Sequence, residues 1–294
     1  MELRHLRYFV AIAEAGTVSA AAARLHVTQP SLSRQLRQLE RDLGVDLFDL
    51  VGRRLLLSPA GRTLLPLARD VLGRAGALRA AAAFHARGRL ERLTIGAPTV
   101  TLTDVVAPFI AGLRADDPTA DVLGADGLSP AETLRLGADL AISTVAAGDP
   151  FRSRPLAVLP VWAYVPPSHP WASRATVTLA ELLRESLIVM PRSSTARQSL
   201  DAAVAGSMAG EFRAVEAANG TVAQALAAAG RGIAVATDDP RFGLIPLAVD
   251  LEDRHLSIRL IAVWDSRHAA AATIEQFATR LATFVRTRYH APPS

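Results

Sequence analysis

Apolar residues between Leu3 and Ala13 recur every three or four positions, which predicts an amphipathic helix that ends near Gly16. Thr17 is placed to cap a second, shorter helix. The alanines at 20–23 carry small side chains, so a neighbouring helix can approach this one closely. The chain is therefore expected to begin with two packed helices.

A third helix follows, and its two faces differ in chemistry. Thr28 is placed to cap it, and Pro30 lies in its first turn, where a missing N–H costs no hydrogen bond. Leucines from Leu32 to Leu43 form one stripe, and Gly44 ends the helix. The positions on or beside the exposed side are Gln29, Ser31, Ser33, Arg34, Arg37, Gln38 and Arg41. Such side chains bond phosphates and base edges, so the helix suits the major groove of DNA.

Two short apolar runs flank the basic turn Gly52-Arg53-Arg54, which predicts a small β-hairpin, or wing. Arg53 and Arg54 are candidates for contact with the DNA backbone or the minor groove, whose negative potential attracts arginine.

A long helix is predicted next, because Ser58 can cap it, Pro59 can open it, and apolar positions then recur between Leu64 and Ala82. A single stripe of this length favours a partner helix from a second copy of the chain, although packing on its own body is the alternative. Pro66 lies inside the pattern and is expected to remove a hydrogen bond or bend the helix.

From Arg92 onward, short apolar strands alternate with capped helices, which indicates α/β architecture with largely parallel sheets. Ser129 and Thr178 each precede a glutamate at capping-box spacing. The proline-rich stretch 156–171 is expected to cross between two lobes. The predicted elements are strands at 93–97, 138–143 and 187–190, and helices at 105–113 and 273–289.

Composition narrows the classes of function. The chain has 294 residues, which predicts two or three domains. It has no cysteine, which excludes disulfides and a thiol switch. Residues 1–92 hold 15 arginines and 8 acidic residues, whereas residues 93–294 hold 17 and 20, so the basic part is expected to meet a polyanion. The N-terminus lacks a secretory pattern and the uncharged stretch 155–173 is broken by prolines, so no membrane span is expected and the protein is placed in the cytoplasm.

The N-terminal residues closely resemble the signature of LysR-type transcription regulators over about the first 62 residues. The matching segments are Leu6-Arg7-Tyr8-Phe9, Ala21-Ala22, Leu25, Val27-Thr28-Gln29-Pro30-Ser31-Leu32-Ser33, Leu39-Glu40, Leu43-Gly44, Leu47-Phe48 and Leu57-Ser58-Pro59-Ala60-Gly61. The resemblance implies that Thr28, Gln29, Pro30, Ser33 and Arg34 face DNA. It departs at Leu50, where the family usually has arginine, so a wing contact is expected either to be missing or to be made by Arg53 or Arg54 instead.

The resemblance also implies a fold and a division into domains. It implies a winged helix-turn-helix over 1–58, a linker and dimerisation helix over 59–90, and an effector-binding domain over 91–294. That last domain is expected to be a two-lobed α/β fold of the type 2 periplasmic-binding-protein class. The first lobe is expected to comprise about 91–160 and 265–294, and the second about 161–264.

Ligands in such folds lie at strand ends and helix N-termini, where free N–H groups favour anions. Three segments map to that cleft. They follow the first strand, follow the strand that ends at Met190, and lie at the start of a helix near residue 220. The effector candidates are Thr99, Val100, Thr101, Arg192, Ser193, Ser194 and Asn219. Hydroxyls and Arg192 suit a small carboxylate, and the alternative is that these residues are caps and solvated loop positions.

The sequence therefore predicts a DNA-binding transcription regulator that senses a small molecule, without a cofactor or metal. The expected partners are double-stranded promoter DNA, an organic-acid effector, RNA polymerase and further copies of the chain in a homodimer or homotetramer. A regulator that takes no ligand is the nearest alternative. An enzyme is disfavoured because the seven histidines show no catalytic or metal-binding spacing, and a solute-binding protein because no signal peptide precedes the DNA-reading helices.

Overall fold

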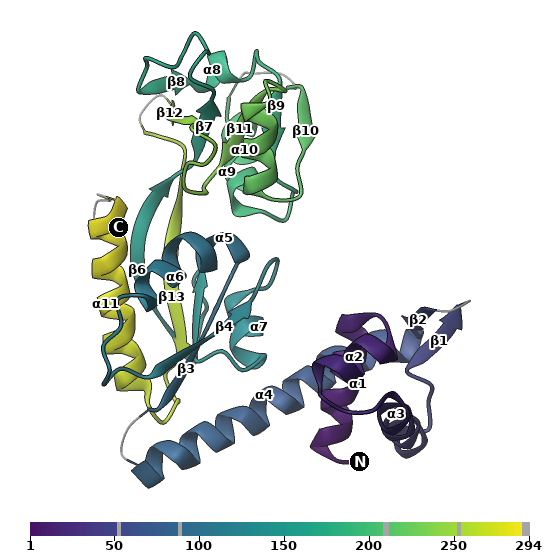
Figure 1. Cartoon of the computed structure of the whole chain (residues 1–294). Coiled ribbons are helices and arrows are strands. Elements are labelled where there is room, and N and C mark those ends of the chain that lie inside the picture. Colours follow the sequence, from purple (N-terminus) through teal and green to yellow (C-terminus); the bar gives the residue numbers. More distant parts are fainter. Residues whose placement is uncertain (52–53, 88–89, 208–211, 252–253, 290–294) are drawn as a thin grey trace. The chain divides into compact units, whose positions relative to one another are not determined.

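The computed structural model describes residues 1–51, 54–87, 90–207, 212–251 and 254–289. The chain divides into two compact units (Figure 1). One, here called the head, comprises Met1–Arg89 with Leu134–Ala138, and the other, the body, comprises Leu90–Thr133 with Asp139–Ser294.

The head contains three helices, α1 (Leu3–Ala15), α2 (Val18–Arg24) and α3 (Gln29–Leu43), followed by a hairpin of β1 (Phe48–Val51) and β2 (Arg54–Leu57) and by the long helix α4 (Pro59–Arg87). The predicted helix limits are confirmed. Gly16 and Gly44 take positive φ angles of 70° and 72° at the ends of α1 and α3, and the Thr17 hydroxyl accepts a hydrogen bond from Ala20 N. The hairpin predicted around the basic turn is also confirmed.

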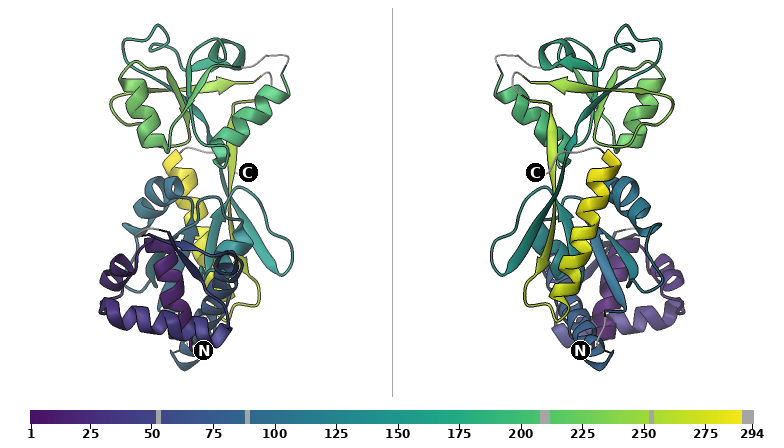
Figure 2. Two further views of the ribbon diagram at one scale, coloured as in Figure 1. Left: turned by 90° about the vertical axis from the view of Figure 1, so that its right-hand side faces the viewer. Right: turned by 90° about the vertical axis from the view of Figure 1, so that its left-hand side faces the viewer.

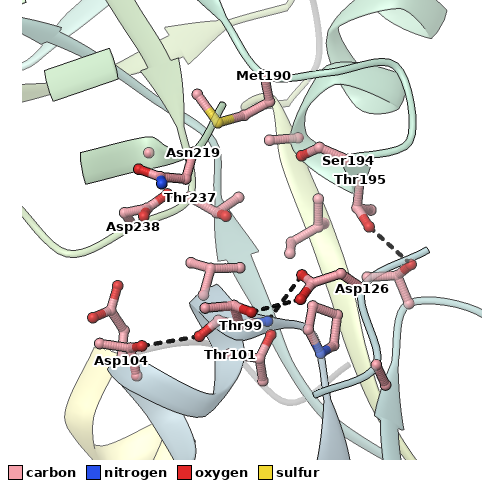
Figure 3. Close-up of a pocket in the computed structure, with 18 of the residues that line it drawn as sticks. Thr99, Thr101, Asp104, Asp126, Met190, Ser194, Thr195, Asn219, Thr237 and Asp238 are labelled. Atoms are coloured by element: carbon pink, nitrogen blue, oxygen red, sulfur yellow. Dashed lines mark hydrogen bonds between the residues drawn. The ribbon is translucent and has the colours of Figure 1, made fainter. Parts of the chain in front are cut away.

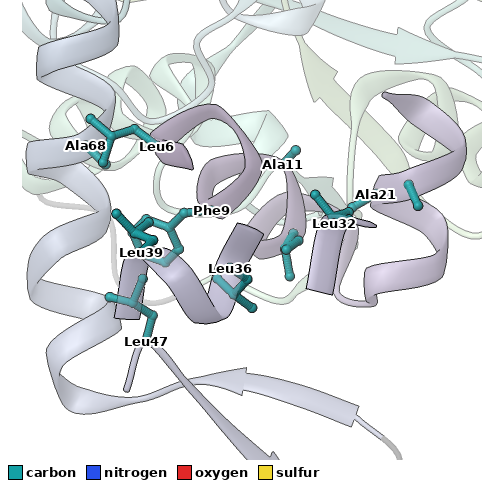
Figure 4. Packing of buried hydrophobic residues seen from close by; sticks show 11 residues of the cluster. Leu6, Phe9, Ala11, Ala21, Leu32, Leu36, Leu39, Leu47 and Ala68 are labelled. Atoms are coloured by element: carbon teal, nitrogen blue, oxygen red, sulfur yellow. The ribbon is translucent and has the colours of Figure 1, made fainter. Parts of the chain in front are cut away.

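The core of the head is formed by apolar side chains from all four helices (Figure 4). Phe9 is 1% exposed, and its ring meets that of Phe48 edge to face with the centroids 5.6 Å apart. Leu32 and Leu39 from α3 are fully buried beside it. Burial of this stripe turns the polar and basic side of α3 outward.

Helix α4 runs as one helix through Pro66. Its start is capped as predicted, because Gly61 N donates to the Ser58 hydroxyl at 2.9 Å. Ala68 packs into the core of the head, and Leu64, Leu65 and Leu72 lie partly buried against it. Proline inside a helix removes one backbone donor, and packing on both sides of it compensates for that loss.

The body consists of two lobes, each built on a mixed sheet (Figures 1 and 2). The first sheet has the order β4 (Thr119–Gly124), β3 (Arg92–Ala97), β5 (Leu140–Ser143), β13 (Ser257–Asp265) and β6 (Phe151–Pro160). The second has the order β10 (Ala214–Glu216), β9 (Leu187–Val189), β11 (Ile233–Ala236), β7 (Trp162–Val165), β12 (Ile245–Asp250) and β8 (Thr176–Thr178). The two-lobed α/β class predicted from the sequence is confirmed.

Helices flank both sheets. They are α5 (Thr99–Thr101), a π-helical turn at Leu102–Val106, α6 (Ala107–Ile110), α7 (Pro130–Arg135), α8 (Leu179–Leu182), α9 (Thr195–Ala205), α10 (Gly220–Ala228) and α11 (Ala271–Tyr289). The last of these packs along β6 and β13 (Figure 2). Both predicted capping boxes form, with Ser129 and Glu132 before α7, and Thr178 and Glu181 before α8.

The proline-rich stretch 156–171 crosses between the lobes as expected, from β6 in the first sheet to β7 in the second, and much of it is β-strand. Pro155 and Pro160 lie in β6, an edge strand on which proline is tolerated. Pro155 also lies at the irregularity in the pairing of β6 with β13. The chain returns to the first lobe at Ser257 and not at residue 265, because β13 is a long strand that pairs with β6 along its whole length.

Candidate functional site

The outward side of α3 is the first candidate site. Thr28, Gln29, Pro30, Arg34 and Arg37 are exposed. Ser31 and Ser33 are partly exposed. The Thr28 side chain makes no capping bond, and the Gln29 Oε1 atom accepts from the Ser19 hydroxyl at 3.2 Å. Together these residues form one polar and basic surface at the N-terminal half of the helix.

The two arginines of this surface differ in their contacts. Arg37 Nε donates to Ser33 O at 3.4 Å. No ion pair joins Arg34 to any residue in the described part of the chain, so its guanidinium is available to a phosphate or a base. In the wing, Arg54 begins β2, whereas Arg53 lies outside the described residues.

The second candidate site is a cavity of about 630 Å³ in the body (Figure 3). Its walls come from both lobes, including the start of the helical segment after β3, the loop after β4, the segment before α9, the start of α10 and residues 237–241. A cavity of this size suits a small organic molecule. Of the residues predicted to touch an effector, those that line it are Thr99, Val100, Thr101, Ser193, Ser194 and Asn219. Arg192 does not line the cavity, and its side chain is exposed.

Two of the predicted effector contacts already have partners within the protein. Asp126 accepts from Thr99 N at 3.0 Å and from the Thr99 hydroxyl at 2.5 Å. Asn219 Oδ1 accepts from Val222 N at 2.9 Å and so caps α10. By contrast, Ser194 precedes α9 without a side-chain cap. The donors expected for an anion are therefore only partly free.

The structure adds four charged residues that the sequence did not assign to the cavity, Asp104, Asp126, Asp238 and Arg241. Asp104 is 7% exposed in the π-helical turn, where its Oδ1 accepts from Arg241 Nη2 at 2.7 Å. Its Oδ2 accepts from Asp239 N at 2.9 Å. The run of two aspartates at 238–239 is the feature of the sequence that points to this cluster.

The same cluster ties the two lobes of the body together. Arg288 Nη2 of α11, in the first lobe, donates to Asp239 Oδ2 of the second at 2.7 Å, as Asp104 of the first lobe bonds Asp239 and Arg241 of the second. Within the first lobe, the Tyr289 hydroxyl donates to Asp104 O at 2.8 Å. Within the second lobe, the buried Tyr164 hydroxyl donates to Asp238 O. The wall of the cavity at residues 238–241 is thus held by residues of the first lobe and by Tyr164 of the second.

Asp238 carries the most perturbed carboxyl of the cavity. It is 7% exposed, and its nearest cationic atom, Arg241 Nη1, lies 3.8 Å from its Oδ1. Burial, together with the negative charge of Asp104, raises its pKa to about 6, and Arg241 opposes the rise. The group is therefore ionised at neutral pH at a cost to the folded state.

The variant Asp238→Asn tests that cost. The pKa of Asp238 in the folded protein lies above its ordinary value of 3.8, so the native protein loses stability as pH rises from about 4 through about 6. The difference between the two pKa values corresponds to a loss of about 3 kcal/mol. We expect the variant to be more stable than the native protein at pH 7.5 by up to that amount, and the gap to close near pH 4. Urea denaturation across this pH range measures it, with the exposed Asp116→Asn as control. A gap that does not change with pH would contradict the assignment.

Neither a metal-binding cluster nor a membrane-spanning helix is found among the described residues. No group of three or more histidine or acidic side chains in this part of the chain is arranged to hold a metal ion. Within the same residues, none of the helices is long and apolar enough to cross a membrane.

Two family models match the chain. Residues 3–62 match the bacterial regulatory helix-turn-helix protein of the lysR family, and residues 86–286 match the LysR substrate binding domain. The regulator TfdT of Cupriavidus pinatubonensis is 40% identical over 125 residues, which cover 42% of this chain and 54% of that protein. The dual regulator OxyR of Escherichia coli is 31% identical over 198 residues, covering 65% of this chain and 64% of that protein. The matches thus span about half to two thirds of the length of these relatives.

Solved structures share the whole fold. The full-length regulator CbnR in complex with its target DNA covers 96% of this chain and 100% of that chain, with a TM-score of 0.67 and 24% identity. A full-length OxyR variant from Pseudomonas aeruginosa covers 100% of this chain and 97% of that chain, with a TM-score of 0.63 and 23% identity. At this identity the likeness concerns the fold alone.

Proposed function

Since the chain belongs to the LysR family of bacterial helix-turn-helix regulators, we propose that it is a sequence-specific DNA-binding transcription regulator whose body senses a small molecule. The observation that carries the proposal is the polar and basic side of α3, turned outward by a buried leucine stripe and centred on Arg34, which has no ion pair among the described residues. The relatives that match are themselves named as transcription regulators, which supports a regulator over an enzyme.

In this proposal the N-terminal half of α3 enters the major groove. The residues that would contact DNA from it are Thr28, Gln29, Pro30, Ser31, Ser33, Arg34 and Arg37. Arg34 would read a base edge, because a guanidinium matches the two acceptors of guanine, and Arg37 would hold a phosphate. Arg53 and Arg54 of the wing would contact the flanking backbone or minor groove.

The protein would act as a homodimer, or as a homotetramer of two dimers. On α4 the side chains of Leu67, Val71 and Leu78 are 57%, 42% and 73% exposed. They follow one another at spacings of four and seven residues and so lie along one side of the helix. An exposed apolar stripe of this kind suits the same stripe of a second copy, which would place two reading heads on neighbouring half-sites.

The cavity of the body would bind the effector. Its lining residues come from both lobes, so a ligand that contacts both walls would favour one arrangement of the lobes over another. In a tetramer, that preference would change the spacing of the heads and the bend of the DNA, and thereby the access of RNA polymerase in the cytoplasm. With no cysteine in the chain, the signal would be ligand binding and not thiol oxidation.

The double variant Leu67→Glu, Leu78→Glu tests the assembly on which this mechanism depends. Charges on the α4 stripe should prevent pairing, so we expect the mass in analytical ultracentrifugation to fall to that of one chain of 31.2 kDa. DNase footprinting of the DNA upstream of its gene should show paired half-sites with the native protein and none with the variant. Arg79→Glu, exposed on a different side of α4, is the control and should leave the mass unchanged. A native protein that is itself monomeric would refute the dimer.

A further inference from the structure

We propose that the effector of the cavity is a small organic cation, one that carries a protonated amine or guanidinium, and not a simple carboxylate. The inference rests on the proposed function, because it takes the cavity as the effector site. It differs from the sequence-based prediction of an organic acid, and the charges of the cavity wall are the reason.

The first step is the charge of the wall. Among the described residues that line the cavity, three are acidic, Asp104, Asp126 and Asp238, and Arg241 alone is basic. The Arg241 guanidinium is already engaged, with Asp104 Oδ1 at 2.7 Å and Asp238 Oδ1 at 3.8 Å. An anionic ligand would have to take Arg241 from these partners and would leave buried carboxylates unpaired, at a large cost. The wall as built has an excess of negative charge.

The second step concerns the place where an anion was expected. Thr99 N and the Thr99 hydroxyl both donate to the Asp126 carboxylate (Figure 3). The protein's own carboxylate therefore occupies the position that a ligand carboxylate would need. A carboxylate has about four acceptor positions, and Thr99 uses two of them, so Asp126 can still accept from a ligand N–H. Asp126 is exposed, which keeps it accessible.

The third step is the distribution of the acidic groups between the lobes. Asp126 follows β4 of the first lobe, whereas Asp238 follows β11 of the second and lies near Asn219 (Figure 3). A cation between the two walls would be attracted to both. It would also relieve the repulsion that a second carboxylate imposes on buried Asp238. The charge that recognises the ligand would thus also draw the lobes together.

The remaining surface suits the rest of such a molecule. Met190, Leu159 and Ile142 supply apolar wall for a hydrocarbon stem, and threonine and serine hydroxyls supply acceptors. The start of α9, where Ser194 is uncapped, could accept an anionic group at the far end of the same ligand. A zwitterion such as an amino acid is therefore compatible with the wall, but an acid without an amine is not.

Matched pairs of amines and acids on one carbon skeleton test the inference on the full-length protein. The probes are butylamine and butyrate, benzylamine and benzoate, butane-1,4-diamine and succinate, agmatine, and the common amino acids. Thermal unfolding and calorimetric titration at pH 7.5 measure binding. We expect compounds with a free amine or guanidine to raise the unfolding midpoint and the simple acids to leave it unchanged. Asp126→Asn should weaken binding of the best amine at least tenfold, whereas Asp116→Asn, which is exposed elsewhere in the body, should not.

The outcomes separate this inference from the proposed function. Stabilisation by the simple acids, or amine binding that both Asp126→Asn and Asp238→Asn leave unchanged, would overturn the cationic effector while leaving the cavity as the effector site. Stabilisation by none of the probes would overturn both the cationic effector and the effector role of the cavity. It would favour a regulator that binds DNA and works without a ligand.

Discussion

Replacing Phe9 with alanine is expected to lower the free energy of unfolding of the head by about 3–5 kcal/mol. Phe9 is 1% exposed at the centre of the helical core, packed edge to face on Phe48, so the shorter side chain leaves a cavity that helices on several sides cannot fill. A loss of this size is a large share of the stability of a small domain. Urea denaturation followed by circular dichroism should resolve an early transition of the head.

The body should be spared, because its core is separate from that of the head. The variant is therefore expected to lose DNA binding at 37 °C while its cavity still binds the amine that stabilises the native protein. Leu56→Ala, in β2 with 51% of the side chain exposed, is the matched control and should change stability little. Equal stability of Phe9→Ala and the native protein would refute the assigned core.

Replacing Arg34 with alanine is expected to weaken binding to the specific DNA site by about 10- to 100-fold, which corresponds to the 1–3 kcal/mol typical of a guanidinium on a base pair. Its side chain is exposed on α3 and forms no ion pair with a described residue, so removal should not disturb the fold. Fluorescence anisotropy with a labelled duplex measures the affinity. Binding to a shuffled duplex should fall much less, since only a base contact carries sequence information.

Arg4→Ala provides the control for charge. Arg4 is exposed on α1 and pairs with Glu2, so this variant removes one positive charge from the same unit without touching α3. We expect it to change specific affinity by less than threefold. If Arg34→Ala and Arg4→Ala weaken both duplexes equally, Arg34 contributes only general charge, and the reading of bases must lie with Gln29 or the serines.

The head was predictable because local rules determine it. The leucines of α3, the caps at Thr17 and Ser58 and the glycines at 16 and 44 each act within a few residues, and each forms as expected. Pro66 was expected to disturb α4, yet the helix continues through it, since packing of its flanking turns on the core outweighs one lost hydrogen bond.

The cavity was less predictable because its chemistry depends on tertiary assembly. Its hydroxyl residues could be placed from strand ends, and Thr99 and Ser194 do line it. Its charges could not, because Asp104, Asp126 and Asp238 come from three distant segments and no periodicity links them. Asp104 lies in a π-helical turn that the sequence did not predict, and Arg192, the expected cation, is exposed outside the wall.

The most direct test of the central claim, that α3 of the head reads a DNA sequence, is the affinity of the purified native protein for the duplex upstream of its gene, compared with a shuffled duplex over a series of salt concentrations. The account predicts a preference of at least about 10³-fold for the native duplex, with an affinity that falls steeply as salt rises because phosphate contacts release counterions. Equal and weak binding to both duplexes, together with no loss in Arg34→Ala, would contradict it.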